Sequence, residues 1–375
     1  MKVNGGRRWL ALVLSLMVSG GLLWFALRDL HLEEVTGVLR GANYWWLVPG
    51  VAVYFISVWF RAWRWGFLLR GSKRVSTAEK HLFGKTENPA RAVSRKMKNV
   101  TGVLGANQLF PVVVIGYMGN DILPFRLGEV LRAYVLWRKE GINIGATFTT
   151  AVLERLFDGL TMVLFVLFGL LFIPLSDFLS RLVVVASVAF FGALLTFLFL
   201  AARPDLLQRV AYFFIERLSP ARLHPPLMEL VEGIVAGLES LRSGRDVLVL
   251  FGVTLWVWIL ETAKYWLVSF AFPDLHLPYV GILLMGGAVN LLTALPSLPG
   301  YIGTFELGIK ILEGIGAPSA PAGSYILVLH AILLLPVTLL GLVFMAREGV
   351  QWAEVSKLQV ASRKSQVADQ ARPRK

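Results

Sequence analysis

Long apolar runs without Asp, Glu, Lys or Arg recur along this chain, and short charged segments separate them. The runs cover residues 9–27, 44–60, 99–120, 159–176, 182–202, 277–305 and 314–346, and a further run, 247–273, is interrupted only by Glu261 and Lys264. A helix that crosses the hydrocarbon core needs about 20 such residues, and lipid-exposed backbone there must be helical or part of a closed barrel. We therefore expect an all-α polytopic membrane protein, a helical bundle of about 8 crossings. The hydrophobic share of 56% agrees with this class.

The net charge of +13 is concentrated in two places, which predicts an orientation. Eleven basic residues and two acids lie between residues 61 and 98, and seven basic residues and three acids lie from residue 347 onward. Basic segments next to spans face the cytoplasm and sit well against anionic lipid. We expect a multi-pass protein of the cell (plasma or inner) membrane with both termini cytoplasmic, and no nucleic-acid partner.

Polar segments divide the chain into expected parts. Residues 1–346 are expected to form an integral-membrane domain, whose first run is an anchor rather than a cleaved signal peptide because it is long and ends in bulky residues instead of a small-residue cleavage site. Within this domain, 71–102 is a basic cytoplasmic insertion, and 203–246 is a cytoplasmic amphipathic segment with apolar residues at helical spacing. Residues 347–375 are expected to be a basic, disordered cytoplasmic tail.

Cysteine and histidine usage limits the chemistry that the chain can perform. There is no cysteine, which excludes disulfides, thiol catalysis and thiolate metal sites. The five histidines are too scattered for a metal signature, and no Gly-rich nucleotide loop or paired-aspartate motif is present. We therefore expect no metal, no other cofactor and no catalytic residue.

The segment 120–132, NDILPFRLGEVLR, places charges between two apolar regions. Pro124 bends the chain and removes a donor, and Gly128 allows close approach or an unwound turn. In a helix after Pro124, Arg126, Glu129 and Arg132 follow at i, i+3 and i+6, a row that suits phosphate oxygens. One interpretation is a re-entrant segment facing a polar cavity, and the alternative is an interfacial helix with ordinary ion pairs.

Two further charge groups lie within apolar stretches. Glu154, Arg155 and Asp158 lead directly into the run 159–176, and Glu261 and Lys264 stand three apart inside 247–273. A charge at mid-bilayer costs roughly 2.5 to 3.5 kcal/mol, so these side chains should be paired and should face protein or water. Each group is interpreted either as a substrate or coupling site or as a structural ion pair.

The segment 294–308, ALPSLPGYIGTFELG, predicts a second broken span. Its breaks are Pro296, Pro299 and Gly300, and the amides near Gly303 and Thr304 begin a second half-helix that can receive an anion. Glu306 follows, where it can pair with an arginine or bind a proton, and a simple kinked span is the alternative.

The lone His330 in the last run is expected either to hydrogen-bond within the bundle or to be proton-linked. A weak internal echo relates Pro124, Gly128 and Glu129 to Pro299, Gly303 and Glu306, as in inverted-repeat transporters.

Four motifs together resemble one known family. They are RAWRWGFLL (61–69), GYMGNDILPFRLGEVLRAYVL (116–136), LERLFDGL (153–160) and PSLPGYIGTFELG (296–308). The chain is similar to the integral-membrane domain of the lysylphosphatidylglycerol synthase transmembrane (flippase-like) family, from about residue 10 to 346, although its basic insertion is longer than expected. The resemblance implies a bundle with re-entrant elements that moves a lipid headgroup between leaflets. We expect no aminoacyltransferase domain like that of the bifunctional synthases after the last run, because residues 347–375 are too few to form one.

These observations predict a lipid flippase or transporter for an anionic or zwitterionic headgroup, of a phospholipid or a polyprenyl-phosphate-linked glycolipid. The alternatives are a membrane-embedded glycosyl- or acyltransferase, for which Asp121 is the isolated acidic candidate, and a non-transporting scaffold for an envelope-lipid enzyme. The expected partners are membrane lipids, with a homo-oligomer or a lipid-modifying enzyme also considered. The candidate substrate-binding residues are Asn120, Arg126, Glu129, Arg132, Glu154, Arg155, Asp158, Glu261, Lys264, Gly303, Thr304 and Glu306.

Overall fold

The computed structural model describes most of the chain. The described residues are 31–82, 104–123, 127–142, 144–173, 203–218, 244–293, 301–303 and 305–349, with isolated positions at 24, 181–192 and 224–232. The first and fifth predicted runs, 9–27 and 182–202, therefore lie almost entirely outside these residues. So do Pro124, Arg126, Pro296, Pro299, Gly300 and Thr304.

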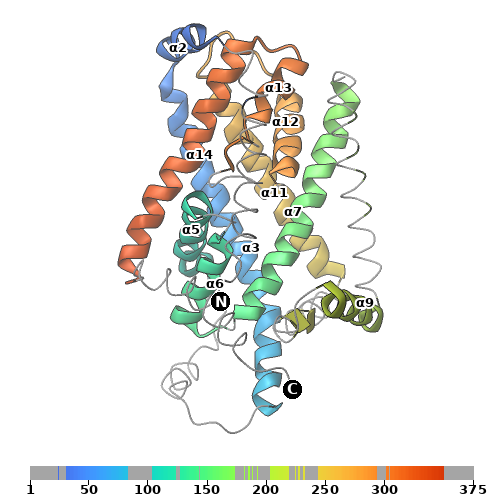
Figure 1. Cartoon of the computed structure of the whole chain (residues 1–375). Helices are drawn as coiled ribbons and strands as arrows, with labels where there is room; N and C mark the ends of the chain where they lie inside the picture. The colour runs from blue at the N-terminus through green and yellow to red at the C-terminus, as the bar shows by residue number, and fades with distance from the viewer. Residues whose placement is uncertain are drawn as a thin grey trace, which may run out of the picture.

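The described part of the chain is helical and contains no strand, which confirms the predicted all-α class (Figure 1). Its elements are α2 (Leu32–Gly41), the short η1 (Tyr44–Trp46), α3 (Leu47–Leu82), α5 (Ala106–Ile122), α6 (Gly128–Glu140), α7 (Ile144–Phe172), α9 (Pro204–Leu218), α11 (Gly244–Ser269), α12 (Tyr279–Leu292), α13 (Leu307–Gly314) and α14 (Ser319–Arg347).

Four of these helices are long and apolar enough to cross a membrane. The stretches that qualify, among the residues that the structure covers, are Tyr44–Leu69, Thr147–Phe172, Arg245–Ser269 and Ser319–Arg347. They belong to α3, α7, α11 and α14. The protein is thus a membrane protein, as the alternation of apolar and charged segments predicts.

The remaining two apolar runs, 99–120 and 277–305, contain the short helices α5 and α12. α5 has 17 residues and α12 has 14, so at 1.5 Å per residue they reach only about 25 and 21 Å, less than a hydrocarbon core of about 30 Å. Each is followed by a second short helix, α6 or α13. The α5–α6 pair lies in the lower half of Figure 1 and the α12–α13 pair in the upper half. We call them the first and the second hairpin.

The packing of the helices repeats between the two halves of the chain. α3 packs on α5 as α11 packs on α12, and α5 on α14 as α12 on α7. Likewise, α6 contacts α7 as α13 contacts α14. The contact of α3 with α7 corresponds to that of α11 with α14, and the contact of α3 with α14 corresponds to that of α11 with α7. Exchanging α3, α5, α6 and α7 with α11, α12, α13 and α14 therefore preserves these contacts. Because the hairpins lie in opposite halves of the molecule, the arrangement is that of an inverted repeat.

Each hairpin packs in a hydrophobic core that includes side chains of a span from the other half of the repeat. The first core gathers around Trp65, Ile115 and Leu131 and includes Val337 of α14. The second core is built from α11 to α14 and includes Val166 of α7. The last span of each half thus closes the core of the other, which fixes both hairpins against the same set of spans.

The predicted polar segments fall at the edges of this bundle. α3 continues to Leu82, so residues 71–82 of the predicted insertion are helical, and residues 83–102 lie outside the described part. In 203–246, α9 is a separate helix that lies beside one end of the bundle in Figure 1, whereas most of the predicted amphipathic stretch falls on residues that the structure does not describe. The last span ends at Arg347, and 350–375 are likewise outside.

Candidate functional site

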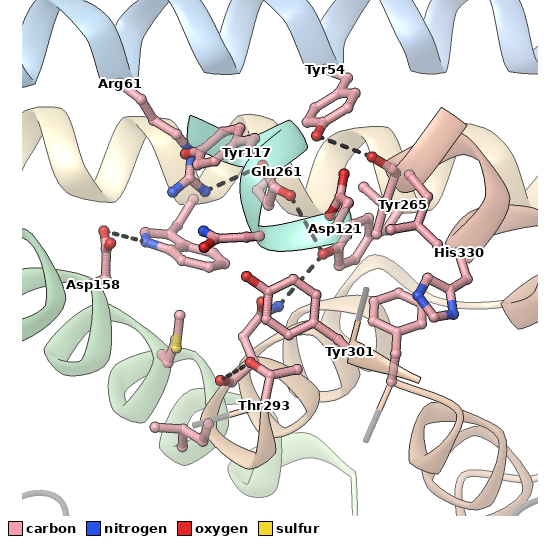
Figure 2. Close-up of a pocket in the computed structure, with 18 of the residues that line it drawn as sticks. Tyr54, Arg61, Tyr117, Asp121, Asp158, Glu261, Tyr265, Thr293, Tyr301 and His330 are labelled. Atoms are coloured by element: carbon pink, nitrogen blue, oxygen red, sulfur yellow. Dashed lines mark hydrogen bonds and ion pairs between the residues drawn. The ribbon is translucent and has the colours of Figure 1, made fainter. Parts of the chain in front are cut away.

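A cavity of about 460 Å³ lies between the spans and the two hairpins (Figure 2). This volume is in the range of ligand-binding cavities, roughly 300 to 1,000 Å³. Both halves of the repeat and the turn before α13 form its wall. The polar and aromatic lining residues are Tyr54, Arg61, Tyr117, Asn120, Asp121, Arg155, Asp158, Trp258, Glu261, Tyr265, Asn290, Thr293, Tyr301, Phe305 and His330.

One part of the wall carries two cations around one acid. Nη2 of Arg61 lies 3.3 Å from Oε2 of Glu261, and the guanidinium group lies over the Trp258 ring, 4.8 Å from its centroid. Lys264 contacts the other oxygen of Glu261 and is completely buried, with its ammonium nitrogen 3.6 Å from the centroid of the Tyr54 ring. With both cations charged and the acid ionised, this part of the cavity has a net charge of one positive unit. We call Arg61, Glu261 and Lys264 the cationic triad.

An ion pair joins Asp158 of the adjacent wall to Arg64, which lies behind it. Nη1 of Arg64 is 2.6 Å from Oδ1 of Asp158 and also donates to the hydroxyl of Thr254 at 3.0 Å. The indole N–H of Trp258 donates to the same Asp158 oxygen at 2.9 Å. Arg64 is only 2% exposed, so its charge depends on these partners rather than on water.

The first hairpin is attached to α7 by further ion pairs. Arg132 of α6 lies 2.9 Å from Glu154 of α7 and 2.8 Å from Glu129 of its own helix, and Arg155 of α7 lies 2.8 Å from Glu129. The Arg132 guanidinium covers the ring of Trp65, 4.4 Å from its centroid. We call Glu129, Arg132, Glu154 and Arg155 the first joint. Its charges balance, and only Arg155 reaches the cavity.

The second hairpin is attached to α14 by a different pair, which we call the second joint. Nδ1 of His330 lies 2.7 Å from Oε1 of Glu306, and the backbone N–H of Gly303 donates to Oε2 at 2.6 Å. The ring of Phe305 lies against His330, with 4.7 Å between the ring centroids. Both members of the pair are buried, and His330 lines the cavity.

The turn that leads into the second joint has an unusual backbone. Gly303 has φ +89°, which glycine adopts readily, but Tyr301 has φ +63°. Positive φ is uncommon for a residue with a Cβ, and such strain concentrates at functional sites. The strained Tyr301 is itself part of the cavity wall.

The end of α5 supplies polar groups to the cavity and holds the start of α6. The Asn120 side-chain oxygen accepts from the Gly128 N–H at 3.0 Å, and a Cβ on Gly128 would overlap the Gly116 carbonyl oxygen. Asp121 accepts a hydrogen bond from Thr338 of α14 at 3.0 Å. Gly128 is therefore required for the close contact between α5 and α6, and Asp121 is a carboxylate on the wall that is held by a hydroxyl group.

The predicted site residues divide into three groups. Asn120, Arg155, Asp158, Glu261 and His330 line the cavity. Glu129, Arg132, Glu154, Lys264, Gly303 and Glu306 lie next to it and hold or neutralise lining residues. Arg126 and Thr304 lie outside the described residues. The predicted row of Arg126, Glu129 and Arg132 thus contributes Arg132 to a joint rather than to the lining.

Sequence reasoning missed Arg61, Arg64 and the tyrosines as site residues. Arg61 is 200 residues from its partner Glu261, and Arg64 is 94 residues from Asp158, so the sequence places neither pair together. A signal was nevertheless present, because two arginines three apart continue directly from an apolar run and each requires a partner within the bundle.

The wall of the cavity offers several kinds of polar group. Within the residues that the structure describes, no group of three His, Asp or Glu side chains could hold a metal ion. The wall instead combines guanidinium, carboxylate, amide and phenol groups inside an apolar bundle. Such a cavity can accept a polar or charged group that would otherwise be excluded from the membrane interior.

Comparisons with known proteins agree on one family. The family model described as the lysylphosphatidylglycerol synthase TM region matches residues 10–341. A UPF0104 membrane protein of Methanothermobacter thermautotrophicus is 27% identical over 253 residues, which cover 63% of this chain and 72% of the relative. The protein named glycosyltransferase AglD of Haloferax volcanii is 26% identical over 250 residues, 58% of this chain but only 39% of that protein. No solved structure matches the chain significantly. Because the family model covers most of the chain, including all four motifs, this protein belongs to the family of the lysylphosphatidylglycerol synthase transmembrane region.

Proposed function

We propose that this protein moves the headgroup of a lipid between the two leaflets through the cavity, while the lipid tails stay in the bilayer. The observation that carries the proposal is a cavity of about 460 Å³ that has charged and polar side chains in its wall, lies among apolar spans and is bordered by two hairpins from opposite halves of the bundle. Inverted-repeat transporters place their substrate site between such broken elements.

The charges of the wall favour an anionic or zwitterionic headgroup. With its three groups charged, the cationic triad beside the cavity carries one net positive charge, and Arg155 adds a guanidinium group that is 52% exposed. Arginine offers a planar set of donors that fits phosphate oxygens. Asp121 gives the same cavity a carboxylate for an ammonium or hydroxyl group. A phospholipid and a polyprenyl-phosphate-linked glycolipid both meet these requirements.

Phosphate capture is assigned to Arg61 and Arg155. The sequence-based candidates for this role were Arg126, which lies outside the described residues, and Arg132. Arg132 is buried between Glu129 and Glu154 and is absent from the cavity lining. Arg61, by contrast, shares the single acid Glu261 with Lys264, so a phosphate can take over part of its coordination without leaving an unpaired carboxylate.

Lipid exchange in liposomes tests this proposal. The purified protein is reconstituted with labelled phosphatidylglycerol, phosphatidylethanolamine or a polyprenyl-phosphate sugar, and inter-leaflet exchange is measured. We expect exchange of at least one lipid above protein-free liposomes, and a loss of about tenfold in Arg61→Gln, equivalent to about 1.4 kcal/mol. Arg40→Gln, on the exposed surface of α2, is the matched control and should keep the wild-type rate. Folded protein that exchanges none of the three lipids would contradict the proposal.

A membrane-embedded transferase is the second candidate, because one relative is named a glycosyltransferase. The match covers only 39% of that relative, so its named activity can reside in the part without a counterpart in this match. Under the transferase hypothesis, membranes containing the protein would accumulate a modified lipid that is absent without it. Under the scaffold hypothesis, Arg61→Gln would leave the lipid composition and the exchange rate unchanged.

The proposal also covers location and partners. We infer that the protein sits in the cell (plasma or inner) membrane with both termini in the cytoplasm, because the basic segments 61–98 and 347–375 then face the cytoplasm. Its partners are membrane lipids, and neither a nucleic acid nor a cofactor has a role in the mechanism. A homo-oligomer or a lipid-modifying enzyme remains compatible with this proposal.

A further inference from the structure

The two joints connect equivalent helices with different chemistry. In the first half, the second helix of the hairpin is held to the last span by arginine–carboxylate pairs. In the second half, the same contact, between α13 and α14, is made by Glu306 and His330. Arginine keeps its charge at every physiological pH, whereas histidine is the side chain whose charge ordinarily changes between about pH 5 and 8. The repeat therefore contains one permanent joint and one that can change its charge.

We propose that the Glu306–His330 pair is the binding site of a proton that couples headgroup movement to pH. This inference rests on the proposed lipid transfer and names its coupling ion. The pair is suited to this role by position, because His330 lines the cavity and Glu306 lies where the second hairpin enters α13.

The hydrogen bonds show how the pair can hold one proton. Oε2 of Glu306 accepts from the Gly303 N–H, and Oε1 faces Nδ1 of His330, where the tautomer of the ring decides which of the two atoms donates. The proton is therefore assigned to the pair, whose empty form is an ionised Glu306 beside a neutral His330. One proton takes the pair from a net charge of −1 to neutral, and the Gly303 hydrogen bond is retained.

Several other titratable or charged groups lie near the Glu306–His330 pair. Asp121 of α5 and Tyr301 of the turn share the cavity with His330, together with Tyr54 of α3 and Glu261 and Tyr265 of α11. Lys264 is held at Glu261, and Lys310 and Glu313 of α13 pair with each other at 2.9 Å. On α2, which packs against the start of α14, Glu33 and Glu34 are exposed. Asp121 is consequently the competing candidate for the proton, and the experiment must distinguish it.

Coupling follows because the proton and the headgroup share one cavity. An ionised Glu306 beside a neutral His330 repels a phosphate, and protonation removes this net charge. The phosphate and the proton therefore strengthen each other's binding, and linkage requires the effect to be reciprocal. Couplings of this kind are typically about 5- to 150-fold in affinity.

The test is the pH dependence of lipid exchange, in liposomes with the same pH on both sides and subsaturating labelled phosphatidylglycerol. We expect the wild-type rate to rise about fivefold or more from pH 8 to pH 5.5. His330→Gln should exchange lipid at a rate that hardly varies over this range. His276→Gln is the matched control, since His276 is exposed before α12, and it should keep the wild-type profile. A profile that persists in His330→Gln but disappears in Asp121→Asn would overturn the inference and assign the proton to Asp121.

A second measurement does not depend on transport. NMR of the protein with isotope-labelled histidine side chains identifies His330 as the signal lost in His330→Gln. We expect this signal to change between pH 8 and pH 5.5, and this change to be altered in Glu306→Gln and on addition of phosphatidylglycerol. A His330 signal that does not titrate in this range overturns the proton site even if lipid exchange is found. If the signal titrates but no lipid exchanges, the proposed function fails and the proton site stands.

Discussion

The first joint and the second joint occupy equivalent places in the inverted repeat, yet they carry charge in different ways. The first contains two arginines and two glutamates and is backed by the buried Arg64–Asp158 pair. The second contains one histidine and one glutamate. In each joint an aromatic ring covers the cationic or basic group, Trp65 over Arg132 and Phe305 over His330. The geometry is similar, but only the second joint contains a histidine, the side chain whose charge ordinarily changes near neutral pH.

This difference suggests different roles for the attachments of the two hairpins. Breaking a buried network of fixed charges leaves an uncompensated ion, so the first hairpin is held in one arrangement. A histidine–carboxylate pair stays hydrogen-bonded whether the ring is neutral or protonated, so the second hairpin can respond to its surroundings without losing its attachment. We therefore expect equal substitutions in the two joints to have unequal effects.

The largest difference is expected for the same isosteric change in the two acids. Glu154→Gln removes the charge that lies 2.9 Å from Arg132 and 3.9 Å from Arg64, and should lower the free energy of unfolding by about 3–5 kcal/mol. Glu306→Gln should lower it by only about 1 kcal/mol, because the amide can still accept from Gly303 and donate to Nδ1 of the other histidine tautomer. Denaturant unfolding in detergent micelles measures both values.

Glu140→Gln serves as the control for this pair of substitutions. Glu140 is the last residue of α6, its side chain is only partly buried, and it belongs to neither joint. Its free energy of unfolding should stay within about 0.5 kcal/mol of wild type. Equal losses in Glu154→Gln and Glu306→Gln would remove the distinction between a permanent and a variable joint.

The glycines of the two hairpins provide the next comparison. A Cβ on Gly128 would overlap backbone atoms of Gly116 and Asn120, which cannot move without separating α5 from α6. Gly128→Ala should therefore destabilise by about 3 kcal/mol or more. On Gly308 of α13, the nearest atom to a Cβ is the end of the Ile326 side chain at 2.8 Å, and alanine is the better helix former. Gly308→Ala should change stability by less than about 1 kcal/mol.

Gly252→Ala in α11 completes this comparison, since a Cβ added at Gly252 would have no atom within 4 Å. It should be neutral or stabilising by up to about 1 kcal/mol, and thermal unfolding in the same detergent compares the three variants. Tolerance of alanine at position 128 would show that the first hairpin is less tightly fixed than its ion pairs suggest.

Much of this fold follows from the apolar runs alone. Four runs became the spans of α3, α7, α11 and α14, because uncharged segments of this length have few alternatives in a bilayer. The run 99–120 was harder to interpret, since the described helix within it begins only at Ala106 and is too short to cross. Its hairpin depends on the contact of Gly128 with Gly116, which no local pattern displays.

The candidate site was only partly predictable. The rule that charges within spans must be paired identified Glu154, Asp158, Glu261 and Lys264. It could not identify Arg61 or Arg64 as partners, because those pairs join helices distant in the sequence. The rule also could not separate cavity-lining residues from buried ones, since burial depends on the packing of several helices. This is why Arg132, predicted to bind substrate, lies in a closed ion-pair network.

The smallest difference between a substitution and its control is expected for the aromatic ring of the second joint. Phe305→Leu keeps an apolar side chain beside His330 and loses the ring contacts with His330 and Tyr265, whose centroids lie 4.7 and 6.4 Å away. Such aromatic contacts contribute about 0.5–1.5 kcal/mol, so the free energy of unfolding should fall by about 1 kcal/mol. Phe168→Leu, at an exposed aromatic pair with Phe172 on α7, is the matched control and should fall by less. A loss above about 3 kcal/mol in Phe305→Leu would mean that the second joint is as intolerant as the first, because Phe305 would then support the hairpin rather than only cover the histidine.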